Sequence, residues 1–257
     1  SLFSEFNAER KRKALPEMPW LAALVCLASF DLALFDAYGE LHGAPVFSLL
    51  GDAFLNHDLA WFYGRGEGAR FAGLYPEAFL TSPAPRSLPA WHLVGGKDLL
   101  TEKELVGTEP KDGYPVVLAD WIARDGLKCL KIKLTGTDAA WDFCRIREVG
   151  RLAAARGAHW LSVDFNCTVR DPSYVCDILD RLLAEEPAVY AMILYVEQPF
   201  PYDLERNQID VHSVSARKPL FMDESAHDWK FLAMGRSLGW TGVALKTCKT
   251  LTGALLS

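Results

Sequence analysis

Residues Leu127-Lys128-Cys129-Leu130-Lys131-Ile132-Lys133-Leu134 alternate between apolar and basic side chains, and this stretch predicts a strand of a β/α barrel. Successive side chains of a strand point to opposite faces, so the apolar residues from Leu130 onward share one face, while Lys131 and Lys133 share the other. The apolar face has to pack against helices to leave water. We therefore expect both ammonium groups to point into the interior of the barrel.

Short strand-like runs of this kind alternate with helical stretches over residues 87–257. Units of roughly 25 to 35 residues that repeat in this way predict an α/β fold, with parallel strands joined by helical crossovers. The predicted helices include 139–156 and 173–185. The predicted strands are 88–94, 127–134, 160–165, 193–196, 220–222 and 242–245. A closed barrel needs about eight strands, so six predict an incomplete barrel whose C-terminal units are missing from the sequence.

The N-terminal part of the sequence predicts a separate helical region. Apolar positions recur at helical spacing over residues 21–50, with a break at His42-Gly43-Ala44-Pro45 and a stop at Gly51. Residues 52–89 are rich in glycine, proline and aromatic residues, and we expect loops and a linker there.

We place the domain boundary near Arg86, with residues 1–86 as the helical domain and linker and residues 87–257 as the barrel. The segment Trp20–Phe35 is strongly apolar. It is too short to span a membrane and Asp31 interrupts it, so we predict a buried helix instead.

The composition is that of a soluble globular protein, because half of the 257 residues are apolar and 23% are charged. The net charge of −6 leaves no basic excess to neutralise phosphates, so we expect neither a nucleic-acid nor a membrane partner. The one basic run, at residues 9–13, predicts a solvated helix face. Six cysteines without a C-x-x-C pair, and the absence of a signal-peptide pattern, favour the cytoplasm. The aromatic residues of the linker hint at a homo-oligomer.

Polar side chains gather where the predicted strands end. By the same alternation we expect Asp164, Asn166 and Glu197 to point inward. Asp223 and Glu224 directly follow an apolar run, and Lys246 ends the last predicted strand. The carboxyl ends of barrel strands form one face of the fold, where barrel active sites are built. The sequence therefore predicts that these groups converge.

Carboxylates brought together in a partly dry cavity repel one another by roughly several kcal/mol, so they need protons or a cation. A set of oxygen ligands without histidine or cysteine favours Mg²⁺. Adjacent side chains point to opposite faces, so only one of Asp223 and Glu224 can readily reach the ion. Lysines on the second and sixth strands would flank that ion. We expect the cation to lower the pKa of such a lysine and let it act as a base.

These motifs, taken in order, resemble those of the enolase superfamily, in its muconate-lactonizing-enzyme subgroup of the mandelate racemase/muconate lactonizing enzyme family. They are Lys131-Ile132-Lys133, Asp164-Phe165-Asn166, Val196-Glu197-Gln198-Pro199, Asp223-Glu224-Ser225 and Leu245-Lys246. The helical residues 30–51 are similar to the helical part of that family's capping domain. The resemblance implies an enolase-type modified TIM barrel with the helical remnant of an α+β capping domain. The family's N-terminal capping strands, and its barrel strands seven and eight, have no counterpart in the sequence.

The resemblance also implies roles for individual residues. Asp164, Glu197 and Asp223 would bind one Mg²⁺ ion, and Lys133 and Lys246 would form the acid/base pair. Lys131 would assist catalysis, and Asn166 and Glu224 would be supporting residues. The implied reaction is removal of the proton next to the carboxylate of a small molecule through a metal-stabilised enediolate. Racemisation, epimerisation or cycloisomerisation would follow.

Two other functions remain open at this point. A lysine Schiff-base aldolase on a β/α barrel would use Lys246 or Lys133 as its nucleophile. A non-catalytic fragment could retain the same residues without using them. Two further residues near strand ends are expected to be structural or exposed rather than catalytic, His92 and Lys249.

Overall fold

The computed structural model describes residues 2–64 and 66–257, which form two compact units. The first unit comprises residues up to Arg86 together with residues 227–229 and 245–257. The second comprises residues 87–226 and 230–244. Each unit has its own helices, and the second holds the whole sheet.

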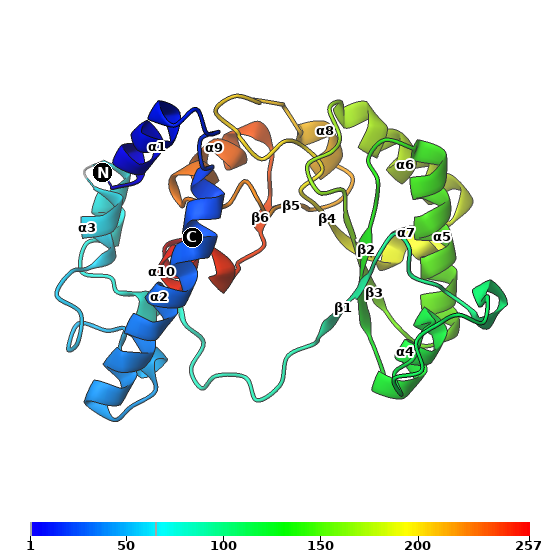
Figure 1. Ribbon diagram of the computed structural model, residues 1–257, viewed down its shortest axis with the longest axis horizontal. Coiled ribbons are helices and arrows are strands. Elements are labelled where there is room, and N and C mark those ends of the chain that lie inside the picture. Colours follow the sequence, from blue (N-terminus) through cyan, green and yellow to red (C-terminus); the bar gives the residue numbers. More distant parts are fainter. Residues whose placement is uncertain (1, 65) are drawn as a thin grey trace. The chain divides into compact units, whose positions relative to one another are not determined.

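The second unit is built on a six-stranded parallel sheet in which the strands follow one another in chain order (Figure 1). The strands are β1 (Trp91–Val94), β2 (Cys129–Lys133), β3 (Trp160–Asp164), β4 (Ile193–Glu197), β5 (Leu220–Met222) and β6 (Gly242–Val243). Each coincides with a strand predicted from the sequence to within a few residues at either end. The predicted α/β fold with parallel strands is confirmed.

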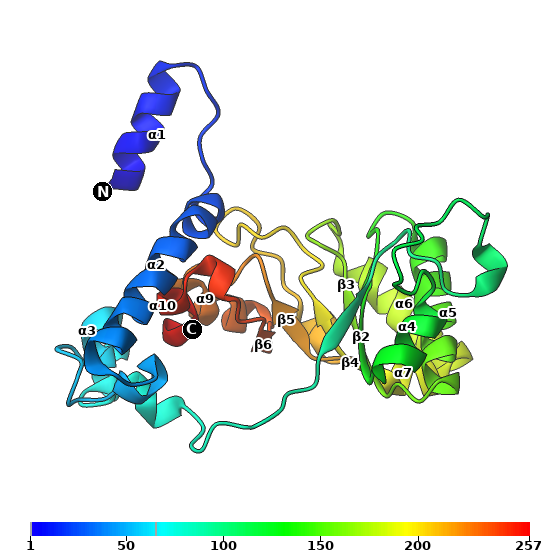
Figure 2. The same cartoon turned by 60° about the horizontal axis from the view of Figure 1, so that its bottom comes forward.

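Helices connect successive strands of this sheet. They are α4 (Leu118–Asp125), α5 (Ala139–Ala155), α6 (Pro172–Glu185), α7 (Pro187–Met192), α8 (His212–Ser215) and α9 (Lys230–Leu238), with a short 3-10 helix, η4 (Glu102–Glu104). Helices α4 to α7 lie on one side of strands β1 to β4 (Figure 2). The two helices predicted at 139–156 and 173–185 are confirmed as α5 and α6.

Aspartates fix the starts of the two long crossover helices. The Asp138 carboxylate accepts a hydrogen bond from the Trp141 N–H at the start of α5, at 3.0 Å. The Asp171 carboxylate accepts one from the Ser173 N–H at the start of α6, at 2.9 Å. Caps of this kind stabilise a helix by about 1 kcal/mol each, and they set the point at which the loop after each strand ends.

The hydrophobic core of the second unit lies between the sheet and its helices. Ile132, Leu161 and Val196 are fully buried on the helix-facing side of β2, β3 and β4. Burying such a side chain stabilises the fold by roughly 1.5 to 3 kcal/mol relative to leaving it in water. The other face of the same strands is left for polar groups, as the alternation predicts.

The first unit contains only helices among its described elements. They are α1 (Leu2–Arg12), α2 (Trp20–His42), η1 (Val46–Leu49), α3 (Leu59–Tyr63), η2 (Glu67–Phe71), η3 (Pro76–Phe79), η5 (Thr247–Lys249) and α10 (Leu251–Leu256). The prediction of loops alone over residues 52–89 was wrong, because α3, η2 and η3 lie there. The Asp58 carboxylate organises this region by accepting hydrogen bonds from the N–H groups of Trp61 and Gly73.

Helix α2 departs from the prediction of a short, buried helix. It has 23 residues, and by length and composition alone it could cross a membrane, which is weak evidence for a membrane protein. Phe30 and Leu34 are 70% and 72% exposed. Elements of the first unit that contact α2 include α1, η1, η5 and α10. The periodicity of a helix reports its apolar residues, but it does not reveal how many of them a neighbour covers.

Asp31 ties α2 to the start of α10. Its carboxylate accepts hydrogen bonds from the N–H groups of Leu251 and Thr252 and from the Thr252 hydroxyl, at 2.7, 3.1 and 2.6 Å. A carboxylate bonded to a helix start is well satisfied. The acidic residue within this apolar segment is therefore explained by a contact inside the first unit.

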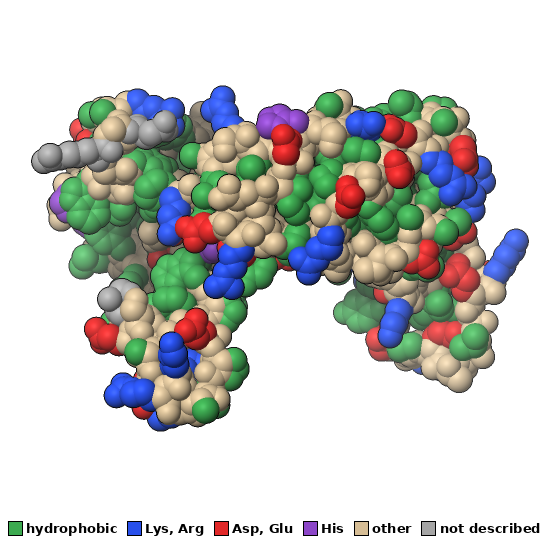
Figure 3. All heavy atoms as spheres, turned by 90° about the horizontal axis from the view of Figure 1, so that it is seen from above, with side chains coloured by type: hydrophobic (Ala, Val, Ile, Leu, Met, Phe, Trp, Pro, Cys, Tyr) green, Lys and Arg blue, Asp and Glu red, His purple; other side chains and the backbone are tan. Residues whose placement is uncertain are grey.

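The basic run of residues 9–13 lies at the end of α1, and α1 has no buried residue. Arg12 and Lys13 both form ion pairs with Glu9. The predicted solvated helix face is confirmed. Basic and acidic side chains are interspersed over the face drawn in Figure 3.

Candidate metal centre

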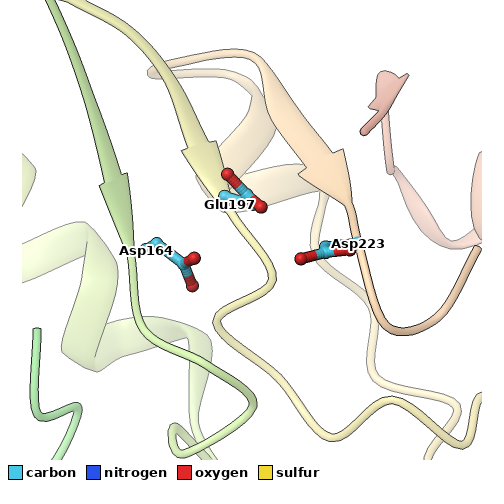
Figure 4. A group of neighbouring side chains, drawn as sticks. All are labelled: Asp164, Glu197 and Asp223. Atoms are coloured by element: carbon cyan, nitrogen blue, oxygen red, sulfur yellow. The ribbon is translucent and has the colours of Figure 1, made fainter. Parts of the chain in front are cut away.

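Three carboxylates from neighbouring strands meet at the carboxyl end of the sheet. Asp164 is the last residue of β3, Glu197 is the last of β4, and Asp223 directly follows β5. The parallel register sets Asp164 beside Glu197. One oxygen of each carboxylate lies within 4.8 Å of the others, and all three residues are buried (Figure 4). The convergence expected from the sequence is present for these three residues.

The chain turns sharply at the end of β3, directly behind one of these carboxylates. Asn166 and Cys167 have φ angles of 47° and 65°, which residues with a Cβ rarely adopt. The Asn166 N–H donates a hydrogen bond to Asp164 Oδ1 at 2.9 Å. We expected the Asn166 side chain to point inward by strand alternation, but β3 ends before it and the residue is exposed. Its observed contribution is this backbone hydrogen bond.

Two lysines of β2 reach the same carboxylates. Lys131 Nζ lies 2.6 Å from Glu197 Oε1 and 2.9 Å from Asp164 Oδ2. Lys133 Nζ lies 2.5 Å from Asp164 Oδ2. The two lysine side chains are 17% and 27% exposed, so they lie at the boundary between the buried carboxylates and water. Both ammonium groups therefore point to the polar face of the sheet, as the alternation of residues 127–134 predicts.

Burial and charge pull the proton affinities of this cluster in different directions. Burial raises the pKa of the Glu197 carboxyl, the hydrogen bond from Lys131 opposes this effect, and the charge of Asp164 adds to it. For Lys131, burial lowers the pKa, but the hydrogen bonds and charges of Glu197 and Asp164 outweigh burial and raise it. The nearest charges to Lys131 are thus anionic and favour its ammonium form. The lowering of a lysine's pKa by a bound cation stays a prediction.

The donor set suits a hard divalent cation. Three buried carboxylates supply only oxygen atoms, which Mg²⁺ prefers, and their mutual repulsion makes a cation favourable between them. The two ammonium groups offset only part of that negative charge. Asp164, Glu197 and Asp223 could therefore hold one metal ion together.

Glu224 does not belong to this trio, although it follows Asp223 directly. Burial raises the pKa of the Cys167 thiol, and the charge of Glu224 adds to the effect. A thiol of raised pKa is a poor nucleophile. Glu224 is thus near the Cys167 thiol of the turn after β3, and the group of carboxylates within 4.8 Å of one another comprises Asp164, Glu197 and Asp223.

Lys246 and Lys249 lie in the first unit, whereas the carboxylates lie in the second. Lys246 follows β6 by three residues and is half-buried. Its position as the second member of an acid/base pair stays a prediction. Lys249 was expected to be exposed, and this was wrong, since it is 6% exposed. It ends η5, which packs against α2. His92 packs against Trp121, with ring centres 5.4 Å apart, which fits a structural residue.

A cavity of about 610 Å³ in the second unit is not lined by any of the three carboxylates. It is lined by residues of α8, α9 and β6, including His212, Arg236 and Trp240, and by none of the predicted site residues. We assign the centre to the carboxylate cluster rather than to this cavity, because three buried like charges are costly to a fold unless something uses them.

Sequence reasoning assigned no role to the side chain of Gln198. This residue follows Glu197 and is fully buried, and its amide is hydrogen-bonded to the segment that carries Asp223. A polar residue at the end of a buried strand, next to a candidate ligand, was the available signal. Strand alternation alone could not show which segment its amide would reach.

Comparisons with known proteins agree with this picture. No family model matches the sequence. A curated relative, L-Ala-D/L-amino acid epimerase from Pedosphaera parvula (strain Ellin514), is 24% identical over 225 residues, which are 87% of this chain and 48% of the relative. The chain thus spans about half the length of the curated relative that it matches.

Solved structures match as well. An enolase from Bradyrhizobium, complexed with magnesium and mandelic acid, aligns with a TM-score of 0.55 and 19% identity, over 99% of this chain and 56% of the other. A mandelate racemase/muconate lactonizing protein from Herpetosiphon aurantiacus aligns with a TM-score of 0.45 and 26% identity, over 54% of this chain and 37% of the other. The first of these alignments shows that the fold is shared.

Proposed function

We propose that this chain, which is similar in sequence and fold to members of the enolase superfamily, removes the proton next to a substrate carboxylate with the help of one Mg²⁺ ion. The observation that carries the proposal is the trio of buried carboxylates at the ends of β3, β4 and β5. The chain would act as an isomerase on a small-molecule carboxylate. We further propose a cytoplasmic location, a homo-oligomeric state, and no nucleic-acid or membrane partner.

Asp164, Glu197 and Asp223 are the proposed metal ligands. When bound, Mg²⁺ supplies positive charge that offsets the negative charge gathering on the substrate carboxylate as its neighbouring proton leaves. The protein contributes the fixed positions of the three carboxylates, since each stands at the end of a strand rather than on a long loop. Rigid placement of this kind lowers the cost of arranging charges during the reaction.

Lys133 is the proposed base on one side of the substrate. Its Nζ atom is already at the cluster, bonded to Asp164, and its side chain is partly open to water. To take up a proton, the amine must first lose one and release Asp164. Lys131 stands between Glu197 and Asp164, so we propose that it keeps their charges balanced and holds them in position. Asn166 and Glu224 are the proposed supporting residues, in the segments that follow β3 and β5.

Lys246 is the proposed partner of Lys133 on the opposite face of the substrate. Two amines flanking one carbon permit removal of a proton from one side and its return on the other. That sequence of steps gives racemisation or epimerisation. If only one lysine transfers a proton and the other stabilises charge, syn elimination or cycloisomerisation follows. The epimerase among the relatives favours the two-base reaction for this chain.

A deuterium-exchange experiment tests the proposal directly. The full chain is incubated in D₂O with a panel of dipeptides, N-acyl amino acids and muconate-like acids, and mass spectrometry follows deuterium at the carbon next to the carboxylate. We expect incorporation with Mg²⁺ and none after chelation. Asp164→Asn should slow it by about 10²-fold or more, because a ligand is lost.

Asp177→Asn is the matched control, since Asp177 is an exposed acid on α6. It should exchange deuterium at the wild-type rate. Exchange that continues without any divalent ion, or that survives Asp164→Asn, would rule the proposal out. Borohydride reduction that fixes a substrate onto Lys246 or Lys133 would instead favour the Schiff-base aldolase.

A further inference from the structure

The side chain of Gln198 is fully buried, and every hydrogen-bonding position of its amide is used. Oε1 accepts from the backbone N–H groups of Asp223 and Ser225, at 2.8 and 3.0 Å. Nε2 donates to the Phe200 carbonyl at 2.9 Å and to the Ser225 hydroxyl at 2.7 Å. One amide therefore links the end of β4 to the segment that follows β5.

The backbone of Gln198 extends this link in both directions. Its N–H donates to the Phe221 carbonyl of β5 at 2.9 Å, and its carbonyl accepts from the Cys167 N–H at 2.8 Å. Cys167 belongs to the turn that follows Asp164. Gln198 is thus bonded to the chain segments that carry the other two carboxylates, and it adjoins Glu197, which carries the third.

The conformation of Gln198 indicates that its side chain matters. Its φ angle is +34°, in the left-handed region where a Cβ is disfavoured and glycine is not. A glycine would adopt the same turn with less strain. A glutamine that accepts this conformation, and whose amide is satisfied on all sides, contributes through the amide rather than through the backbone turn.

We infer that Gln198 is a positioning residue of the metal centre, which holds the backbone of Asp223 at a fixed distance from Glu197. The inference rests on the proposed function, because it presumes that the carboxylates share one ion. Residues that orient metal ligands from behind affect affinity without touching the ion. Gln198 is placed to do this for two ligands at once, since it is bonded to the Asp223 N–H and covalently joined to Glu197.

Affinity for Mg²⁺, measured by isothermal titration of the full chain without substrate, tests the inference. Gln198→Met keeps the length of the side chain and removes all four hydrogen bonds of the side-chain amide. We expect it to bind Mg²⁺ about 10- to 100-fold more weakly than wild type. Ser225→Ala removes only the bond from Nε2 to the hydroxyl, so its loss should be smaller than that of Gln198→Met.

Leu182→Ala is the control for general loosening, since Leu182 is a fully buried core residue of α6. It should lower the midpoint of urea unfolding while leaving Mg²⁺ affinity within about twofold of wild type. If Leu182→Ala loses as much affinity as Gln198→Met, or if Gln198→Met binds as tightly as wild type, the positioning role is overturned.

Gln198→Gly separates the side chain from the turn and replaces Gln198→Met if that variant does not fold. Glycine relieves the strain at φ +34°, so we expect a smaller loss of stability together with an equal loss of affinity. If Gln198→Gly binds Mg²⁺ as tightly as wild type, the positioning role is overturned and the proposed function is not. Absence of Mg²⁺ binding by the wild-type chain itself would overturn the proposed function as well, which distinguishes the two failures.

Discussion

The two faces of strands β2, β3 and β4 carry opposite kinds of side chain. Toward the helices stand fully buried apolar residues such as Ile132 and Val196, and toward the other side stand Lys131, Asp164 and Glu197. The first face stabilises the fold by removing apolar surface from water. The second face costs stability, because it collects charges where water is scarce. Groups that cost stability and still converge are the ones expected to serve function.

Lys133→Ala should produce the largest effect, and it acts on the polar face. Removing the proposed base should lower the rate of deuterium exchange by about 10²- to 10⁴-fold. Metal-free stability should fall as well, because the buried Asp164 carboxylate loses one of its two ammonium partners. The comparison is Lys128→Ala, directly before β2, where the exposed side chain donates a hydrogen bond to the Gly157 carbonyl. Wild-type exchange in Lys133→Ala would show that the proton moves elsewhere.

Ile132→Ala tests the apolar face one residue away. Ile132 is 0% exposed, so the substitution leaves a cavity against the helices and should lower the free energy of unfolding by about 2 to 5 kcal/mol. Urea unfolding followed by circular dichroism measures the change. A loss under about 1 kcal/mol would mean that the two faces of β2 do not differ as described.

The sequence predicts much of this division, because both faces follow from a period of two. Leu130, Lys131 and Asp164 stand where alternation puts them, and α5 and α6 begin at aspartate caps that are visible in the sequence. Alternation predicts the face on which a side chain lies, but it does not predict which other segment of the chain packs against that side chain. The wrong prediction for the burial of α2 has this cause.

Gln198 and Lys249 illustrate the same limit. The importance of the Gln198 amide depends on Asp223 and Ser225, which lie 25 and 27 positions further along the chain. The burial of Lys249 depends on the packing of η5 against α2, from the other end of the sequence. Local pattern fixes the direction of a side chain on a strand, whereas contacts between distant segments need the folded structure.

The free energy of unfolding, measured at several pH values, tests whether the buried charges of the polar face cost stability. The folded pKa of Glu197 is raised, chiefly by burial, so its ionisation opposes folding. The raised pKa means that the protonated carboxyl favours the folded state. This stabilisation is complete below the pKa of the unfolded carboxyl and is lost as the pH rises through the folded pKa. We therefore expect metal-free wild type to lose stability relative to Glu197→Gln as the pH rises above about 4, the usual pKa range of an unfolded glutamate.

Urea unfolding of both proteins in chelator, at several pH values, measures this difference. Addition of Mg²⁺ should reverse the trend for wild type only, because the ion binds the ionised form and stabilises the folded state. A stability difference that does not vary with pH would contradict the raised pKa of Glu197.

The exposed apolar face of α2 should give the smallest effect. Phe30 is 70% exposed within this chain, so Phe30→Ser removes little buried surface and should change the free energy of unfolding by at most about 0.5 kcal/mol. The contrast with Ile132→Ala follows from burial alone, since both are large apolar residues. A destabilisation as large as that of Ile132→Ala would show that the α2 face is covered in solution. Its apolar residues would then belong to a buried surface, as the sequence alone predicts.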